Sequence, residues 1–230
     1  AAEDVREVIT GMGERDAFGE VDAVLSGYQG GTQIGDVILG AVEQVKAANP
    51  DAIYACDPVM GNAKSGCFVH PDIPVLLRER VVPKADLITP NQFELGFLTD
   101  TEPGDLESTL ASVDAAAAMG PSTVLVTSVL QPDRPADTLE LLAVHRDGAW
   151  MVRTEHLPIK VNGSGDVTAA LFTTHLLQTG DPALALGRTA SSVWDLVKRT
   201  LDSGRRELQL VQSQEQIAHP RMQFEVEKVR

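Results

Sequence analysis

The chain has 230 residues, of which 43% are hydrophobic and 23% charged, and its formal net charge is −14. This length is enough for one sizeable hydrophobic core, so we expect residues 1–230 to form a single domain. The negative charge argues against nucleic acid or an anionic membrane surface as partners, because both attract a basic face. An acidic protein can still bind phosphates through backbone N–H groups and a divalent cation.

Cysteine content and the distribution of apolar residues indicate the cellular compartment of the protein. Two cysteines, Cys56 and Cys67, do not make a disulfide framework, and the composition fits a reducing, cytoplasmic compartment. No run of about 18 apolar residues occurs, so we expect no membrane span. The first ten residues lack the basic and apolar regions of a signal peptide and resemble the middle of a helix.

Helical and extended segments alternate along most of the chain. Short apolar runs predict buried strands near residues 22–26, 53–56, 85–89 and 123–130, and apolar residues at helical spacing predict helices over 32–49, from about 91, and over 106–119. Asp147-Gly148 between two apolar runs indicates a β-hairpin. Helices are expected from Asp166 and over 182–201, and residues 205–230 should form a helix and an irregular tail.

This alternation predicts an α/β fold of three layers, with a mainly parallel central sheet covered by helices on both faces. In such sheets ligands bind outside the carboxyl ends of the strands. Polar residues directly after predicted strands should therefore line one edge. They are Tyr28, Asp57, Thr89, Asn91, Thr127 and Ser128.

A glycine-rich turn, Asn162-Gly163-Ser164-Gly165-Asp166, leads straight into an apolar segment compatible with a helix. Small residues let the backbone close on a ligand, and the first N–H groups of a helix attract anions. The turn can thus form an anion hole, with the Asp166 carboxylate near the reacting atom. The alternative is structural, because Asp is also a favoured helix N-cap.

Two further clusters allow both structural and functional interpretations. Asp57 precedes Pro58 just past a strand, so it could hold Mg²⁺ or simply stabilise a turn. In Thr89-Pro90-Asn91-Gln92-Phe93-Glu94, the residue types at each position are typical of a helix start with a capping box. Neither a GxxxxGK[ST] loop nor a GxGxxG turn after a strand is present, so any ATP site must use another geometry.

Taken together, five segments in this order resemble the pyridoxal kinases of the ribokinase-like superfamily. They are GYQG at 27–30, DPVMG at 57–61, residues 81–94, VTS at 126–128 and NGSGD at 162–166. DPVM and TPN also occur in hydroxymethylpyrimidine kinases. Those kinases typically have Cys where this chain has Asp166, which favours the pyridoxal branch. The family normally begins with a strand and helix of the substrate and lid region, which we do not find in these residues.

The resemblance implies a role for each matching residue. Asp166 would be the catalytic base for the 5′-hydroxyl of pyridoxal, and Gly163, Ser164 and Gly165 would form the anion hole. Asp57 and Glu94 would organise Mg²⁺ and the ATP phosphates. The remaining ATP-binding residues, some beside a monovalent cation (K⁺ or Na⁺), would be Thr89, Asn91, Thr127, Ser128, Lys160, Val161 and Asn162. Tyr28 would lie along the pyridoxal ring.

We therefore expect a cytoplasmic, homodimeric, ATP-dependent kinase of pyridoxal, and possible further substrates are pyridoxamine and pyridoxine. A hydroxymethylpyrimidine kinase of thiamine synthesis is the nearest enzymatic alternative. A non-catalytic relative that binds vitamers or nucleotides is the alternative from a different class.

Overall fold

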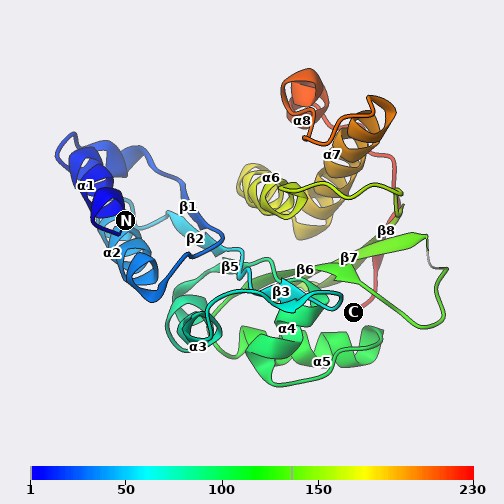
Figure 1. The fold of residues 1–230 in the computed structure, drawn as a ribbon, viewed down its shortest axis with the longest axis horizontal. Helices are drawn as coiled ribbons and strands as arrows, with labels where there is room; N and C mark the ends of the chain where they lie inside the picture. The colour runs from blue at the N-terminus through cyan, green and yellow to red at the C-terminus, as the bar shows by residue number, and fades with distance from the viewer. Residues whose placement is uncertain (1, 136) are drawn as a thin grey trace.

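A seven-stranded sheet runs through the protein in the order β1-β2-β5-β6-β7-β8-β9 (Figure 1). The computed structural model describes residues 2–135 and 137–230, so Ala1 of the predicted N-terminal helical segment lies outside the described residues. The strands of this sheet are Ala23–Ser26, Ile53–Cys56, Leu87–Ile88, Thr123–Val129, Thr138–His145, Gly148–Glu155 and Val226–Lys228. A separate small hairpin pairs β3 (Gly61–Asn62) with β4 (Gly66–Cys67).

The first four strands of the sheet are parallel, and the last three join antiparallel. This confirms the α/β prediction and the hairpin at Asp147-Gly148, where His145 pairs with Gly148. The hairpin extends the same sheet because Thr123 to Val126 of β6 pair with 142–145 of β7. The parallel half places its strand ends at one edge, as parallel sheets with helical crossovers do.

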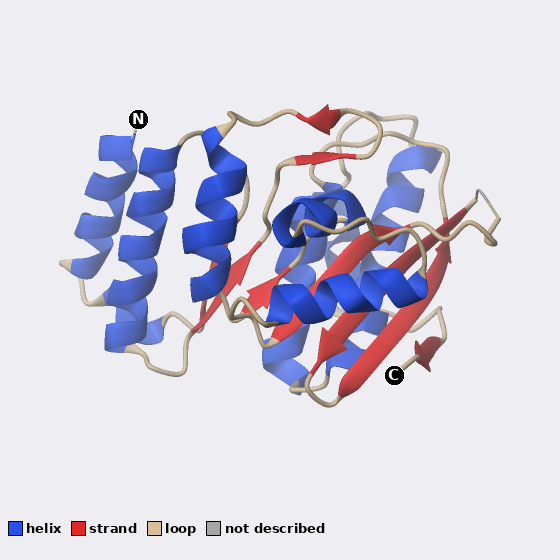
Figure 2. Cartoon of the chain, turned by 90° about the horizontal axis from the view of Figure 1, so that it is seen from below, coloured by secondary structure: helices blue, strands red, loops and turns tan. Residues whose placement is uncertain are grey.

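Helices cover both faces of the sheet, and Figure 2 shows them on either side of the strands. The α-helices are α1 (Ala2–Gly13), α2 (Thr32–Ala48), α3 (Asp72–Leu76), α4 (Gln92–Thr99), α5 (Leu106–Ala117), α6 (Ser164–Thr179), α7 (Pro182–Asp202) and α8 (Gln214–Ala218). A π-helical turn over Leu77–Val81 follows α3. Short 3₁₀ turns lie at Ala17–Glu20, Val82–Lys84 and Val211–Ser213.

Strand β6 explains why both faces need cover. Its side chains alternate, so Val124 and Val126 join the core beneath α4 and α5 while Leu125 joins the core beneath α6 and α7. All three are essentially fully buried. Burial on both faces accounts for the continuous apolar run that marks this strand in the sequence.

The C-terminal segment departs from the sequence-based expectation. The predicted helix is present as α8, but the predicted irregular tail contains strand β9, which pairs Val226, Glu227 and Lys228 with β8. The tail prediction was wrong because this short edge strand is mostly polar, and its pairing partner lies about 75 residues away. Among the described residues, no helix has both the length and the apolar character needed to cross a membrane.

Candidate active site

The carboxyl ends of β2, β5 and β6 bring the predicted polar residues to one edge of the sheet. Cys56 aligns with Ile88 in the β2–β5 pairing, so the next residues, Asp57 and Thr89, are neighbours at this edge. One strand further, Asn91 forms an isolated parallel bridge with Thr127. The local structure therefore places three of the sequence clusters side by side.

Glu94 links two of these clusters through its buried carboxylate. Its Oε1 accepts hydrogen bonds from the N–H groups of Met60 (2.8 Å) and Gly61 (3.3 Å), and its Oε2 accepts one from Asn91 (2.9 Å). Asn91 in turn caps α4 by accepting from the Glu94 N–H, which confirms the capping box. Asn91 Nδ2 also donates to the Gly61 carbonyl at 2.8 Å. Glu94 thus fixes the loop after β2 against the start of α4.

Burial raises the pKa of Glu94, although its three backbone donors favour the charged form. Both carboxylate oxygens already accept N–H groups, so the geometry suits Glu94 to shaping the loop. A direct cation ligand would need a free oxygen lone pair on the open side of the site.

Asp57 is the other buried carboxylate at this edge of the sheet, and it is only 7% exposed. Burial, and then the negative charges of Glu94 and Asp166, raise its pKa to about 7. The Thr89 hydroxyl favours the charged form slightly, but it makes no hydrogen bond of normal geometry with any described residue. Asp57 therefore lies in a site where negative charge is poorly compensated, and a bound cation would stabilise its ionised form.

The glycine turn forms the start of α6 in a way that differs from the capping interpretation. Gly163 is the N-cap residue with a left-handed φ of 84°, and no side chain caps the helix. Asp166 is the third residue of the helix, so the interpretation of Asp166 as the cap was wrong. A left-handed N-cap favours glycine, because a side chain would be strained there. The first helical N–H groups, from Ser164 to Asp166, have no intrahelical acceptor and can bind an anion.

This helix start lies between the two halves of the site. A Cβ added at Gly165 would lie 3.8 Å from Asp57 Oδ2, and one added at Gly27 would lie 3.5 Å from Asp166 Oδ1. Gly27 follows β1, and its neighbour Tyr28 is 61% exposed. Gly165 therefore lies next to Asp57, while the exposed Asp166 carboxylate lies next to the loop that carries Tyr28.

A cavity of about 680 Å³ opens beside the helix start. The predicted residues that line it are Asn91, Thr127, Ser128, Lys160, Val161, Ser164 and Gly165. The other predicted residues lie next to it or outside its lining. They are Tyr28, Asp57, Thr89, Glu94, Asn162, Gly163 and Asp166. The cavity has the volume of a typical site for a ligand of nucleotide size.

Sequence reasoning missed the apolar wall of this cavity. It is built by β7, the segment after β8 and α7, through Leu139, Leu141, Leu157, Ile159, Ala190, Val193, Trp194 and Val197. Asn62, Lys64 and Ser65 of the β3–β4 hairpin close another side. Lys64 lies in the loop after DPVMG, and this position is the sequence signal that could have indicated a residue near the phosphates. The wall residues are ordinary amphipathic positions of strands and a helix, so their pattern carries no functional signal.

A cation site was expected at Asp57 and Glu94. Among the described residues, no group of three or more His, Cys, Asp or Glu side chains is arranged to hold a metal ion. The donor set instead fits a cation bound by one carboxylate together with phosphate oxygens and water, which is the usual mode for Mg²⁺. Asp57 fits that mode better than Glu94, because Glu94 already accepts three backbone N–H groups.

The fold and the site define a class: an α/β enzyme that places a carboxylate and a helix start beside a nucleotide-sized cavity. The family model described as phosphomethylpyrimidine kinase matches residues 20–210. Pyridoxal kinase PdxY of Leifsonia xyli subsp. xyli is 67% identical over 229 residues, covering 100% of this chain and 81% of the relative. The relative of the same name from Rubrobacter xylanophilus is 50% identical over 230 residues, covering 100% of this chain and 79% of the relative.

Solved structures agree with these relatives. Pyridoxal kinase from Leishmania donovani in complex with ADP and pyridoxamine has a TM-score of 0.90 and 25% identity, with 100% of this chain and 82% of that chain covered. The same enzyme with ADP and pyridoxine has a TM-score of 0.89 and the same identity, with 100% and 81% covered. The chain belongs to the pyridoxal kinase family, and it is a kinase of ribokinase-like fold.

Proposed function

We propose that the strand-end site transfers the γ-phosphoryl group of ATP to the 5′-hydroxyl of pyridoxal. The observation that supports this assignment is the position of the α6 start. Its uncapped N–H groups and the Asp166 carboxylate lie between the cavity and the Tyr28 loop. Relatives at 67% and 60% identity are pyridoxal kinases, and related structures contain ADP with pyridoxamine or pyridoxine.

The cavity takes the nucleotide in this proposal. Its apolar wall suits the base, and Asn91, Thr127 and Ser128 face the triphosphate or a monovalent cation (K⁺ or Na⁺). Lys160, Val161 and Asn162 border the nucleotide on the way to the helix start. Thr89 has a buried hydroxyl without a hydrogen-bond partner among the described residues, so it is available to a ligand or a water.

Phosphoryl transfer needs positioning and charge stabilisation more than covalent chemistry by the protein. We propose that the N–H groups of Gly163, Ser164 and Gly165 form the anion hole for the transferred group. Asp57 would hold Mg²⁺ with the ATP phosphates, and Glu94 would support that site by fixing the loop after β2. Bound Mg²⁺ would neutralise charge on the phosphate oxygens.

Asp166 is proposed as the base that accepts the proton of the acceptor hydroxyl. Its exposed carboxylate sits one helical residue beyond the anion hole, so a hydroxyl on the Gly27 side can approach both the carboxylate and the phosphoryl group. Tyr28 is exposed on the same loop and is proposed to lie along the pyridoxal ring. We further propose a single kinase domain, a homodimer and a cytoplasmic location, with pyridoxamine and pyridoxine as additional substrates.

A coupled ADP-release assay tests the substrate class. The full-length enzyme with Mg²⁺ and ATP should release ADP with pyridoxal, and at least about 100-fold more slowly with hydroxymethylpyrimidine at equal concentration, which is about 2.7 kcal/mol of discrimination. A preference for hydroxymethylpyrimidine would contradict the pyridoxal assignment. ATP binding without ADP release for any vitamer would favour the non-catalytic alternative.

A further inference from the structure

A second cavity lies at the edge of the sheet opposite the candidate active site. Its volume is about 450 Å³, and it is bordered by the end of α5, the start of β6, the β7–β8 turn and the segment around β9. Ser122 and Val124 line it at the beginning of β6, whereas Thr127 and Ser128 line the nucleotide-sized cavity at the other end of the strand. Two residues of strand, Leu125 and Val126, lie between Val124 and Thr127, so the two linings are about 10 Å apart along the strand.

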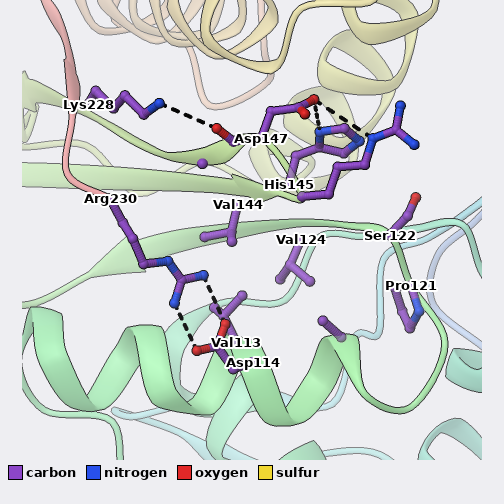
Figure 3. A pocket seen from close by; sticks show the side chains of 13 residues that line it. Val113, Asp114, Pro121, Ser122, Val124, Val144, His145, Asp147, Lys228 and Arg230 are labelled. Carbon is purple, nitrogen blue, oxygen red and sulfur yellow. Dashed lines mark hydrogen bonds and ion pairs between the residues drawn. The ribbon is translucent and has the colours of Figure 1, made fainter.

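The floor of this second cavity is apolar. Val113 of α5, Val124 of β6 and Val144 of β7 contribute buried side chains, and Ala117 extends the same surface. In Figure 3, Val124 and Val144 lie between the Arg230–Asp114 pair and the turn at Asp147. These valines are only 0 to 6% exposed, so the floor offers a small apolar contact surface, enough for a compact ligand only.

The rim carries an excess of positive charge in a strongly acidic protein. Three of the 19 Lys and Arg residues of the chain line this cavity, Arg146, Lys228 and Arg230, against two of its 33 acidic residues. Each of those carboxylates has a protein group close by. Asp114 accepts two 2.8 Å hydrogen bonds from the Arg230 guanidinium, and Asp147 Oδ2 lies 2.9 Å from His145 Nδ1.

Lys228 is the cation least compensated by protein groups. Its Nζ donates only a long 3.4 Å hydrogen bond to the Asp147 carbonyl and lies 5.6 Å from the centre of the Trp150 ring. No carboxylate lies within ion-pair distance of it among the described residues. Arg146 is 83% exposed and reaches Asp147 only at 3.9 Å. Both groups can therefore pair with an incoming anion at little cost to existing contacts.

The backbone that positions Lys228 is tightly constrained. Gly148 has a φ of 149°, and a Cβ added there would lie 2.8 Å from Lys228 Cε and 2.7 Å from the Arg230 carbonyl oxygen. Only glycine allows β9 to approach the hairpin turn this closely. The lysine is thus held against the turn, at the mouth of the cavity.

From this combination we propose that the second cavity binds a small organic anion, a phosphate or carboxylate group on a compact apolar body. The anionic head pairs with Lys228 and Arg146, and the apolar body lies on the floor formed by Val113, Val124 and Val144. This site is separate from the nucleotide and pyridoxal sites, so a ligand can occupy it while ADP fills the active site.

Calorimetric titration of the full-length enzyme with phenyl phosphate and with benzoate, at saturating ADP, tests the site. We expect one molecule bound per chain, with at least about tenfold lower affinity for inorganic phosphate and for phenol, because each offers only half of the recognition. Absence of binding by both aromatic anions, or equal affinity for inorganic phosphate, would overturn the proposal. Displacement of the probes by ADP would place them in the active site and would also overturn it.

Variants assign the binding to the rim. Lys228→Gln and Arg146→Gln should each weaken phenyl phosphate by about tenfold, the value of one charged contact. The matched control is Lys198→Gln, because Lys198 pairs with Asp202 on α7 and does not line the cavity. Arg146 is so exposed that its replacement leaves the fold intact. Unchanged affinity in the Arg146 variant, or an equal loss in the control, would contradict the assignment.

Discussion

The uncompensated charge at Asp57 makes a quantitative prediction for the variant Asp57→Asn. The pKa of this carboxyl is raised from 3.8 to about 7 in the folded protein. The folded state therefore keeps a proton that the unfolded chain has lost, and the ionised group destabilises the fold as pH rises between these two values. At 1.36 kcal/mol per pKa unit, the full effect is about 4 kcal/mol above pH 8.

Replacement by the uncharged amide removes this pH dependence. The stability of Asp57→Asn relative to the parent should therefore increase by about 2 to 3 kcal/mol between about pH 5 and pH 8, since part of the titration already lies below pH 5. Chemical denaturation of the nucleotide-free protein at several pH values measures it. The change with pH is the diagnostic quantity, because the amide can also alter packing by a constant amount.

Two comparisons make the test specific. Asp202→Asn, which removes an exposed carboxylate paired with Lys198 on α7, is the matched control variant. Asp57→Asn should also lose affinity for ATP in the presence of Mg²⁺ while gaining stability without it. A stability difference that does not change with pH would refute the reasoning that Asp57 is destabilised by burial and neighbouring charge.

Three other predictions concern the parts around Asp57. Glu94→Gln replaces an acceptor of three N–H groups by an amide that must turn its NH₂ toward one of them. The free energy of unfolding should therefore fall by about 2 to 3 kcal/mol, measured by chemical denaturation, and the KM for ATP should rise. Unchanged values would contradict the role of Glu94 in fixing the loop. Gly27→Ala should raise the KM for pyridoxal several-fold but leave ATP binding unchanged, because the new methyl lies 3.5 Å from Asp166 Oδ1. Equal effects on both substrates would argue against binding of pyridoxal on the Gly27 side of Asp166. In the Trp150→Phe variant, ATP should change the fluorescence of Trp194, the remaining tryptophan, which lines the cavity. If ATP binds without changing this fluorescence, the nucleotide base lies elsewhere.

Local sequence signals predicted the elements of the fold and the polar half of the site. The capping box at Asn91 and Glu94, the hairpin at Asp147-Gly148 and the positions after each buried strand all depend on residues close in sequence. Parallel pairing then brings strand ends together at one edge, which is why the polar clusters meet.

The parts that were not predicted depend on contacts distant in sequence. The apolar wall of the nucleotide-sized cavity requires β7 and α7 to pack near the same strand end, and no local pattern indicates which face of these elements meets a ligand. Strand β9 forms only because β8 offers it a partner edge. At Asp166, residue type suggested a cap, whereas the left-handed Gly163 takes that position and leaves the carboxylate free.

The most direct test of the central claim is the single-turnover rate of phosphoryl transfer to pyridoxal in Asp166→Asn, measured with ATP binding followed in the same samples. The account predicts that ATP affinity is kept while the rate falls about 1,000-fold, the middle of the range for loss of a positioned base. The matched variant Asp202→Asn should transfer at the parent rate. Transfer by Asp166→Asn at the parent rate would contradict the assignment of Asp166 as the base.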